Sequence, residues 1–338
     1  MMEQTAAGDE KYPGKVCVTG GTGFLASWLI KKLLCRGYYV NATVRSHSPD
    51  KKKDLSFLTS LPQAKERLRI FIADLGDPQS FKAAIEGSVG VFHVAHPIDL
   101  LGTETVEKIT EKSIKGTLGI LQLCIDSGTV KRVVYTSSVA TIFPKEFSGD
   151  DGGELDEESW CDVDFMKKLN FPGAGYCISK TVTERAALEF SEKHGLELVT
   201  VVPSWIHGPF VCPNLPGSVH SSLGLIFGNE NQIKYGKITP MVHTDDTAEA
   251  HIYLFEHPNA KGRYICSAVE VTIEELVDLL RSRHPDLKLV NPESVVNRAA
   301  NFKGLSSKKL LEIGFKYKYG IAEMFDDAIR CCKKNGWL

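Results

Sequence analysis

The sequence lacks the features that direct a protein to a membrane or to nucleic acid. Its first fifteen residues are polar and mixed in charge, and no later apolar run approaches the length that spans a bilayer. No basic block is longer than residues 51–53, and the formal net charge is −2. We therefore expect neither nucleic acid nor a membrane as a partner.

Signs of disulfide or metal chemistry are also missing. The nine cysteines are an odd number without a Cys-x-x-Cys pair, and no histidine spacing is typical of zinc. The adjacent Cys331 and Cys332 would bridge poorly because such a ring strains the backbone. We expect reduced thiols, no metal and a cytoplasmic protein. No internal repeat or low-complexity segment is visible.

The composition is that of a globular enzyme. The chain has 338 residues, of which 43% are hydrophobic and 24% charged. These fractions are ordinary for a soluble domain. The length suffices for one large α/β domain or two unequal ones.

The first 200 residues alternate short apolar runs with longer amphipathic stretches. The apolar runs predict strands at 16–19, 39–44, 68–73, 89–94, 132–136 and 196–202. The amphipathic stretches predict helices at 24–35, 105–127 and 176–194. Strands that are apolar on both sides, with helices between them, indicate a parallel sheet covered on both faces. We predict an α/β fold of the doubly wound Rossmann type over residues 12–203.

The pattern changes after Pro203. Residues 204–240 are rich in proline, glycine and asparagine, with one weak helical signal at 218–227. Helical periodicity returns at 273–283, 306–313 and 321–334. We predict a smaller substrate-binding lobe over residues 204–338, with some strands returning to the main sheet.

A glycine-rich turn joins the first predicted strand to the first predicted helix. Residues 19–26 read Thr-Gly-Gly-Thr-Gly-Phe-Leu-Ala. Gly20 permits a tight turn, Gly23 lets the backbone approach a pyrophosphate, and Ala26 keeps helix and strand close. Glycine turns also end strands for structural reasons alone, but this position in an alternating chain favours a dinucleotide site.

The end of the second strand bears on which dinucleotide binds. NAD sites usually have an acidic residue there, about 20 residues after the glycines, for the ribose hydroxyls. This chain has Arg45 instead, and Lys52 follows seven residues later. Two cations suit a 2′-phosphate and favour NADP(H), whereas the alternative is a solvated basic loop. Asp74, after the third strand, suits either the adenine edge or a cap for the next helix.

Three polar residues suit carbonyl chemistry. Ser138 follows the fifth strand, at the edge where open α/β sheets bind ligands. Tyr176 and Lys180 are four residues apart, which places a phenol and an ammonium on one helical face. A cation beside the phenol favours the phenolate and brings its proton within reach of a carbonyl. The alternative is a turn serine and a half-buried core tyrosine.

Together these motifs resemble the extended short-chain dehydrogenase/reductases over nearly the whole chain. The similarity is greatest to the plant dihydroflavonol reductase group, and within it to vestitone reductases. The resemblance implies the catalytic triad Ser138, Tyr176 and Lys180. It implies NADP(H) contacts at Gly20, Gly23, Phe24, Leu25, Arg45, Lys52, Asp74, Leu75, Val94, Ala95, Tyr176, Lys180 and Pro203. It also assigns His243, Asp245 and Asp246 to a structural turn outside the site.

Departures from the family narrow the substrate. No asparagine follows Ser138 where dihydroflavonol reductases read the flavonoid B ring, and the residues before Tyr176 do not match cinnamoyl-CoA reductases. We therefore expect neither a dihydroflavonol nor a CoA thioester. His96 either orients a substrate hydroxyl or packs beside the nicotinamide. The expected substrate contacts, in a largely apolar pocket, are His96, Phe143, Trp205, Phe210 and Leu223.

The predicted function is the NADPH-dependent reduction of a ketone on an aromatic, polycyclic plant metabolite, with Tyr176 as proton donor. The triad does not fix direction, so oxidation of an alcohol or hemiacetal in alkaloid metabolism is an alternative. A nucleotide-sugar epimerase or dehydratase is another, although residues 204–241 have only Lys234 and Lys237 for a pyrophosphate. A non-catalytic NADP(H)-binding protein is a third, disfavoured by the intact triad. We expect a monomer or weak dimer.

Overall fold

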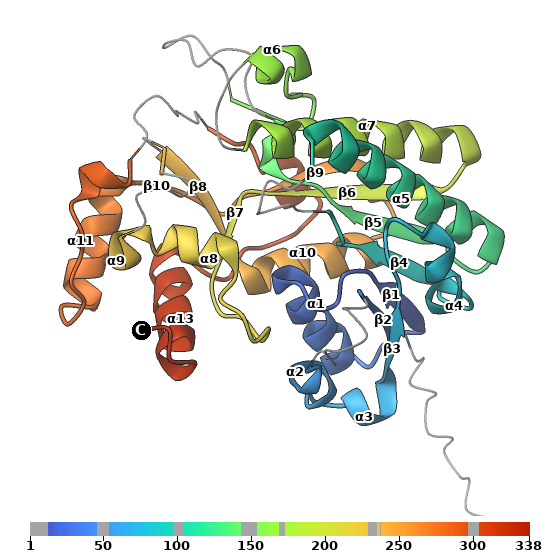
Figure 1. Cartoon of the computed structure of the whole chain (residues 1–338), viewed down its shortest axis with the longest axis horizontal. Helices are drawn as coiled ribbons and strands as arrows, with labels where there is room; N and C mark the ends of the chain where they lie inside the picture. The colour runs from blue at the N-terminus through green and yellow to red at the C-terminus, as the bar shows by residue number, and fades with distance from the viewer. Residues whose placement is uncertain are drawn as a thin grey trace, which may run out of the picture.

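Seven strands form the main sheet of the computed structural model, in the order β3-β2-β1-β4-β5-β6-β9 (Figure 1). The structure describes residues 13–45, 54–97, 104–142, 154–168, 173–228, 235–236, 238–296 and 304–338. All neighbouring strands of this sheet are parallel. The strands are β1 Lys15–Val18, β2 Tyr39–Val44, β3 Leu68–Ile72, β4 Gly90–His93, β5 Arg132–Thr136, β6 Glu197–Pro203 and β9 Gly262–Cys266. The predicted doubly wound sheet is confirmed.

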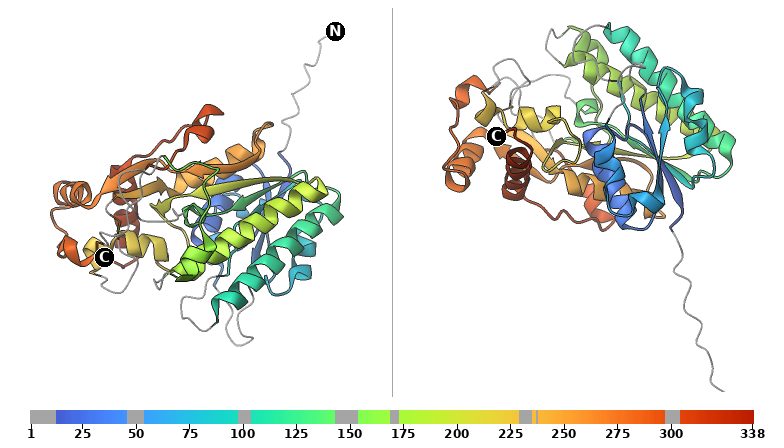
Figure 2. Two further views of the ribbon diagram at one scale, coloured as in Figure 1. Left: turned by 90° about the horizontal axis from the view of Figure 1, so that it is seen from above. Right: turned by 60° about the horizontal axis from the view of Figure 1, so that its bottom comes forward.

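Helices cover both faces of this sheet. On one face α5 Val106–Ser127 and α7 Ala174–His194 lie side by side, and on the other lie α1 Phe24–Cys35 and α10 Thr244–Glu256 (Figures 1 and 2). Successive strand residues point to opposite faces. In β1, Val16 and Val18 therefore pack in the cluster with α1 and α10, while Cys17 packs with α5 and α7. This two-sided burial explains the continuous apolar runs of the sequence.

The long helices end where the sequence predicts. The Thr105 side chain accepts a hydrogen bond from Lys108 N and caps α5, which ends at Gly128 with φ of 62°. Helix α7 likewise ends at Gly195 in the left-handed region. Glycine tolerates this conformation and satisfies the last carbonyl groups.

The region around residue 244 differs from the expectation. We expected a structural turn, but β8 Ile238–His243 ends there and α10 begins at Thr244. The His243 side chain caps α10 by accepting a hydrogen bond from Asp245 N. The first turn of α10 is polar and nevertheless buried. It therefore lacks the one-sided apolar pattern that reveals a surface helix.

A three-stranded sheet organises the smaller lobe, seen on the left of Figure 1. Its order is β10-β8-β7, with β10 antiparallel and β7 parallel to β8. The strands and helices of this part are β7 Trp205–His207, β8, β10 Val269–Thr272, α8 Gly217–Ser222, α9 Gly224–Phe227, α11 Ile273–Arg283 and α13 Ile321–Lys334. Helices α11 and α13 confirm two predictions, and the weak signal at 218–227 becomes α8 and α9.

The later part of the chain also contributes to the main body. Strand β9 pairs with β6, and α12 Lys308–Glu312 packs on β9. The shorter elements are α2 Ser56–Thr59, α3 Ala64–Arg67, α4 Lys82–Ile85, α6 Val163–Lys168, η1 Pro78–Phe81, η2 Val139–Thr141 and η3 Pro292–Ser294. The division into a cofactor domain and a substrate lobe at residue 203 stays a prediction. Helix α10 and strand β9 follow residue 203 in the chain but pack in the main body.

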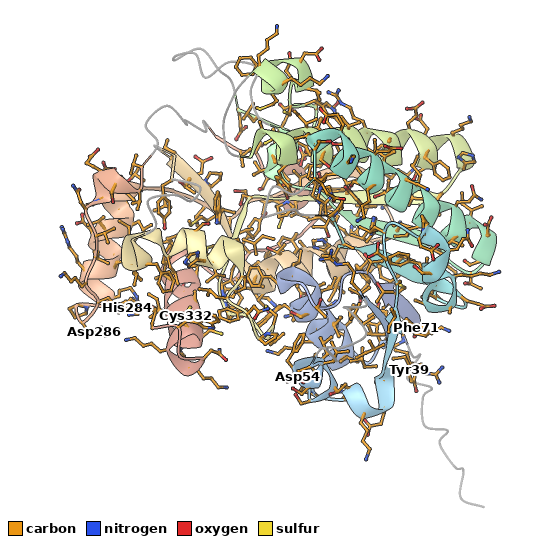
Figure 3. The ribbon with its side chains drawn as sticks, viewed as in Figure 1. Tyr39, Asp54, Phe71, His284, Asp286 and Cys332 are labelled. Carbon is orange, nitrogen blue, oxygen red and sulfur yellow. The ribbon has the colours of Figure 1, made fainter. Side chains whose placement is uncertain are left out.

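Figure 3 marks the two ends of the molecule. Tyr39, Asp54 and Phe71 lie beside the β2 and β3 edge of the main sheet, and His284 and Cys332 belong to the smaller lobe. Within the described part of the chain, no helix is both long and apolar enough to cross a membrane.

Candidate active site

The glycine-rich turn is tied to the strands on both sides of β1. Thr43 of β2 accepts hydrogen bonds from Gly20 N at its side-chain oxygen and from Gly21 N at its carbonyl, at 3.3 and 2.7 Å. On the other side, Thr19 Oγ1 accepts from Val94 N at 3.1 Å and from Ala95 N at 3.0 Å. The structure therefore brings the predicted contacts Gly20, Val94 and Ala95 together.

Gly20 is required by this close packing. Its φ is 71°, and a Cβ there would lie 3.1 Å from both Cα and Cβ of Ala95. A side chain at this position would be strained and would also push the turn away from the end of β4.

The N-terminus of α1 is suited to an anion. Its N-cap is Gly23, which makes no side-chain cap, and the first turn contains no acidic residue. The first backbone N–H groups of a helix have no intrahelical acceptor and carry the positive end of the helix dipole. Phe24 and Leu25 supply two of these groups. The residues present therefore fit a pyrophosphate.

The predicted adenine end is built from two turns. Arg45 directly follows β2 and is exposed. After β3, Asp74 Oδ1 accepts a hydrogen bond from Gly76 N at 2.7 Å, so that this carboxylate closes its own turn rather than capping η1. Leu75 beside it is buried. Lys52 lies outside the described residues.

The proposed triad meets at the carboxyl end of β5. Ser138 caps the 3-10 helix η2 by accepting a hydrogen bond from Ala140 N at 3.2 Å. Lys180 is buried, and its Nζ donates to the carbonyl oxygen of Thr136 at 2.8 Å. Tyr176 borders open surface, with 38% of the residue exposed. The polar side chain of Ser138 favours the ionised form of Tyr176 and acts to lower its pKa.

The charge state of the tyrosine corrects the expectation from spacing. Although 38% of the residue is exposed, the phenol itself is desolvated, which raises the pKa of Tyr176 to about 12 and outweighs the opposing effect of Ser138. Burial also lowers the pKa of Lys180 to about 7, while Glu184 raises it. Because Lys180 Nζ is directed at Thr136, its cation does not produce the expected phenolate. At neutral pH the phenol keeps its proton.

His96 lies against Tyr176, the tyrosine of the predicted triad. Its ring centroid is 5.7 Å from that of Tyr176, with the planes at 88°. His96 Nδ1 is 3.1 Å from Ser113 Oγ, which accepts a hydrogen bond from Thr183 Oγ1 at 3.0 Å. Ser113 can then donate to Nδ1, which assigns the ring proton to Nε2. Nε2 is buried, with no hydrogen-bond partner recorded among the described residues.

Burial also fixes the charge of this histidine. It lowers the pKa of His96 well below 6.5, and the charges of Lys180 and His93 act in the same direction. His96 is therefore a neutral hydrogen-bond donor beside the tyrosine ring.

The remaining predicted contacts are spread over the smaller lobe. Trp205 is half-buried, and its Nε1 donates to Ser218 O at 3.1 Å. Phe210 and Leu223 are buried in the lobe core. A substrate contact by either would require the lobe to rearrange, and it stays a prediction. Pro203, at the end of β6, is buried and pairs with Cys266. Phe143 lies outside the described residues.

The sequence interpretation missed several buried polar residues around the site. Glu184 and Arg263 form an ion pair between α7 and β9, at 3.2 Å. His93 bridges Thr19 and Thr117 through its two ring nitrogens, at 2.9 and 3.0 Å. Glu184 has a local signal, since it follows Lys180 by one helical turn. Arg263 has none, because only the pairing of β9 with β6 brings it near. No cluster of three or more His, Cys, Asp or Glu that suits a metal ion occurs among the described residues.

Comparison with known proteins agrees with this geometry. Residues 17–235 match the 3-beta hydroxysteroid dehydrogenase/isomerase family. The chain is 48% identical to vestitone reductase of Medicago sativa over 326 residues, covering 96% of this chain and 98% of that protein. It is 42% identical to dihydroflavonol 4-reductase of Zea mays, covering 100% and 93% of the two chains.

Solved structures extend the likeness to three dimensions. The crystal structure of alfalfa vestitone reductase superposes with a TM-score of 0.84 at 46% identity, covering 96% of this chain and 99% of that one. A yeast methylglyoxal/isovaleraldehyde reductase complexed with NADPH gives a TM-score of 0.80 at 25% identity, covering 96% and 100%. The chain therefore belongs to the 3-beta hydroxysteroid dehydrogenase/isomerase family of oxidoreductases, within the extended short-chain dehydrogenase/reductases, as its motifs predict.

Proposed function

We propose that this protein is an NADPH-dependent reductase of a ketone on an aromatic, polycyclic substrate of the flavonoid or isoflavanone type. The observation that carries the proposal is the protonated phenol of Tyr176, which lies at the carboxyl edge of the sheet with Ser138 and Lys180 and is partly open to the surface. The similarity to vestitone reductase and to dihydroflavonol 4-reductase supports the substrate class.

The cofactor is assigned to residues 12–203. The glycine turn and the uncapped start of α1 would hold the pyrophosphate, and Arg45 would hold the 2′-phosphate. When bound, NADPH supplies the hydride for the carbonyl carbon. The NADPH complex of the yeast reductase supports this choice of cofactor.

Each triad residue has a role in moving the proton. Tyr176 donates its phenolic proton to the carbonyl oxygen of the substrate. The Ser138 hydroxyl hydrogen-bonds both that oxygen and the phenol, and it stabilises the phenolate left after transfer. Lys180, with a pKa of about 7, is partly charged at neutral pH and is proposed to hold the nicotinamide ribose.

The substrate side is assigned mainly to residues 204–338. His96 Nε2 is buried and would donate a hydrogen bond to an oxygen of the substrate after a local rearrangement, and Trp205 would supply an aromatic surface. The segment 204–228 contains neither lysine nor arginine, which disfavours the pyrophosphate of a nucleotide sugar.

The protonated state of Tyr176 is the state from which a reduction starts, although the same triad can also act in the oxidative direction. A reductase needs a phenol that starts protonated, whereas oxidation of an alcohol or hemiacetal needs a phenolate base. With a pKa of about 12, the phenol is protonated over the neutral range.

The test is a substrate screen with NADPH and NADH in both directions, on flavanones, isoflavanones, nucleotide sugars and alkaloid hemiacetals. We expect NADPH consumption with a flavanone or isoflavanone ketone. Turnover confined to hemiacetal oxidation or to a nucleotide sugar would refute the proposal. Tight NADPH binding without any turnover would instead indicate a sensor or scaffold.

A further inference from the structure

A buried carboxylate on α7 joins three strands of the main sheet. Glu184 is fully buried. Its carboxylate accepts hydrogen bonds from Ser137 Oγ at 2.5 Å, from Thr200 Oγ1 of β6 at 2.7 Å and from Arg263 Nε of β9 at 3.2 Å. The carboxylate is therefore held from three directions.

Arg263 completes the network on the far side of this carboxylate. Its Nη1 donates to the carbonyl oxygens of Glu157 and Ser159, at 2.6 and 2.9 Å. Its Nη2 donates to Thr141 Oγ1 at 2.9 Å, and the guanidinium lies 3.6 Å from the ring centroid of Trp160. All three guanidinium nitrogens thus have acceptors, which a buried arginine requires.

The two members of the pair hold the segment of Ser138 from opposite sides. Glu184 accepts a hydrogen bond from Ser137, the residue that precedes Ser138. Arg263 binds Thr141, whose Oγ1 donates to the carbonyl oxygen of Ser138 at 3.0 Å. The catalytic serine therefore lies between two anchored residues.

The same carboxylate also acts on the catalytic lysine. Glu184 follows Lys180 by one turn of α7. The other groups that face Lys180 are His93 and His96 from β4 and the residues after it, and the ring of Tyr135 from β5, 5.3 Å from Nζ. Among the described residues, Glu184 supplies the negative charge that acts on Lys180.

Stability alone is a weak reason for such a pair. Replacing a buried ion pair by well-packed apolar residues is often neutral or stabilising, since both charges must leave water. Here, however, two of the pair's hydrogen bonds end on Ser137 and Thr141, which lie on either side of Ser138 in the chain.

We propose that Glu184 and Arg263 are positioning residues: together they fix the 137–141 segment so that Ser138 meets Tyr176, and Glu184 keeps Lys180 charged. The inference rests on the proposed reductase function for its kinetic consequence, but not for its effect on Lys180.

The first test removes one link without leaving a buried charge. Thr141→Val deletes the hydroxyl between Arg263 and Ser138 with little change of shape, and Thr141→Ser keeps it. We expect Thr141→Val to lower kcat by about 10- to 100-fold, because a small displacement of a reacting group has this effect. KM for NADPH should stay within about twofold, and Thr141→Ser should restore kcat. A purely structural role would lower the melting temperature and leave kcat unchanged.

The second test does not depend on turnover. In protein labelled with [13Cε]lysine, the Lys180 signal is assigned by its loss in Lys180→Met and titrated with pH. We expect Glu184→Gln to move the Lys180 midpoint to lower pH by about one unit, because the stabilising carboxylate is lost. Glu184→Asp should recover part of the shift. The matched control is Glu197→Gln, which removes a carboxylate paired with the buried Arg132 at the other end of β5 and β6.

The outcomes are separable. Wild-type kcat in Thr141→Val, or an unmoved Lys180 midpoint in Glu184→Gln, overturns the positioning role. If Glu184→Gln does not fold, Glu184→Gln/Arg263→Gln leaves no unpaired charge and carries the same titration. A wild-type protein that binds NADPH but reduces no carbonyl compound overturns the proposed function alone, and the Lys180 titration then decides the inference.

Discussion

Two clusters of polar and ionisable residues in the described part of the chain can be compared, and only one is suited to chemistry. The sheet-edge cluster consists of Ser138, Tyr176, Lys180, Glu184 and Arg263. The junction cluster, where the smaller lobe meets α1 and α10, consists of His207, His243, Asp245, Asp246 and Asp327. By residue type the junction cluster looks the more catalytic, with two histidines and three aspartates.

The polar groups of the junction cluster serve the fold. Asp245 accepts hydrogen bonds from Trp28 Nε1 and Lys32 Nζ, both at 2.9 Å. Asp246 accepts from the backbone N–H groups of Lys318 and Tyr319. These contacts join α10 to α1 and to the chain before α13.

Access separates the two clusters. His207, His243 and Asp246 are at most 1% exposed, whereas Tyr176 is 38% exposed beside the glycine turn. A substrate can therefore reach Tyr176 but not His207, His243 or Asp246 of the junction cluster. Residue types alone therefore do not make a site. A site also needs surface that a substrate can reach, and Tyr176 provides it.

The largest expected effect comes from removing the reacting proton in the sheet-edge cluster. Tyr176→Phe should lower kcat by about 10³-fold, since general acid catalysis contributes about 10²- to 10⁴-fold. NADPH affinity, measured by fluorescence titration, should change little. Full activity in this variant would show that Tyr176 is not the proton donor. Tyr235→Phe, in the lobe core, is the control and should keep kcat.

The cofactor end of the site is tested at Arg45. Arg45→Ala should raise KM for NADPH by about 10- to 100-fold and KM for NADH by much less, because only the former carries a 2′-phosphate. Steady-state kinetics with both cofactors measure the ratio. Equal effects on both would favour the solvated loop. Arg69→Ala, an exposed cation on β3, is the matched control.

A smaller effect is expected at His96. His96→Phe keeps the ring against Tyr176 but removes the Nε2 donor, so KM for the substrate should rise by about 10-fold while kcat changes less. The rise should vanish for an analogue that lacks the accepting oxygen. An equal rise for both compounds would show that His96 only packs beside the tyrosine.

The smallest effect is expected in the junction cluster, as stability rather than activity. Burial raises the pKa of Asp246 to about 6, so the folded state binds its proton more tightly than the unfolded chain, where aspartate titrates near 4. This group's contribution to stability is greatest below about pH 4 and is lost as the pH rises through 6. Asp246→Asn should therefore raise the free energy of unfolding at pH 7 by about 1–3 kcal/mol relative to its effect at pH 4.

The neighbouring aspartate gives the opposite sign and serves as the control. The hydrogen bonds from Lys32 and Trp28 outweigh burial and lower the pKa of Asp245. Asp245 thus stabilises the fold above its unfolded pKa, and Asp245→Asn should destabilise at pH 7 and less in acid. Urea unfolding from pH 4 to 7 measures both. A loss of kcat in either variant, under conditions where the protein is fully folded, would show that the junction cluster also contributes to activity.

The predictable parts of the protein carry their signal locally. The apolar run at 132–136 and the helical period at 273–283 each lie within one element, and both predictions are confirmed. Helix α10 was missed because its polar first turn is buried by Trp28 and Lys32, more than 200 residues away in the chain. The spacing of Tyr176 and Lys180 predicts a lowered pKa for the phenol, whereas burial raises it, because spacing shows the nearby cation but not the burial.

Local sequence signals predict the doubly wound sheet and the glycine turn, because helical and strand periodicity and short motifs depend on neighbouring residues. The same signals predict the triad, whose catalytic role stays a prediction. Only the tertiary structure decided the charge of Tyr176, the burial of Phe210 and Leu223, and the pairing of Glu184 with Arg263. These properties depend on desolvation and on contacts between residues such as 184 and 263, which become neighbours only when β9 joins β6.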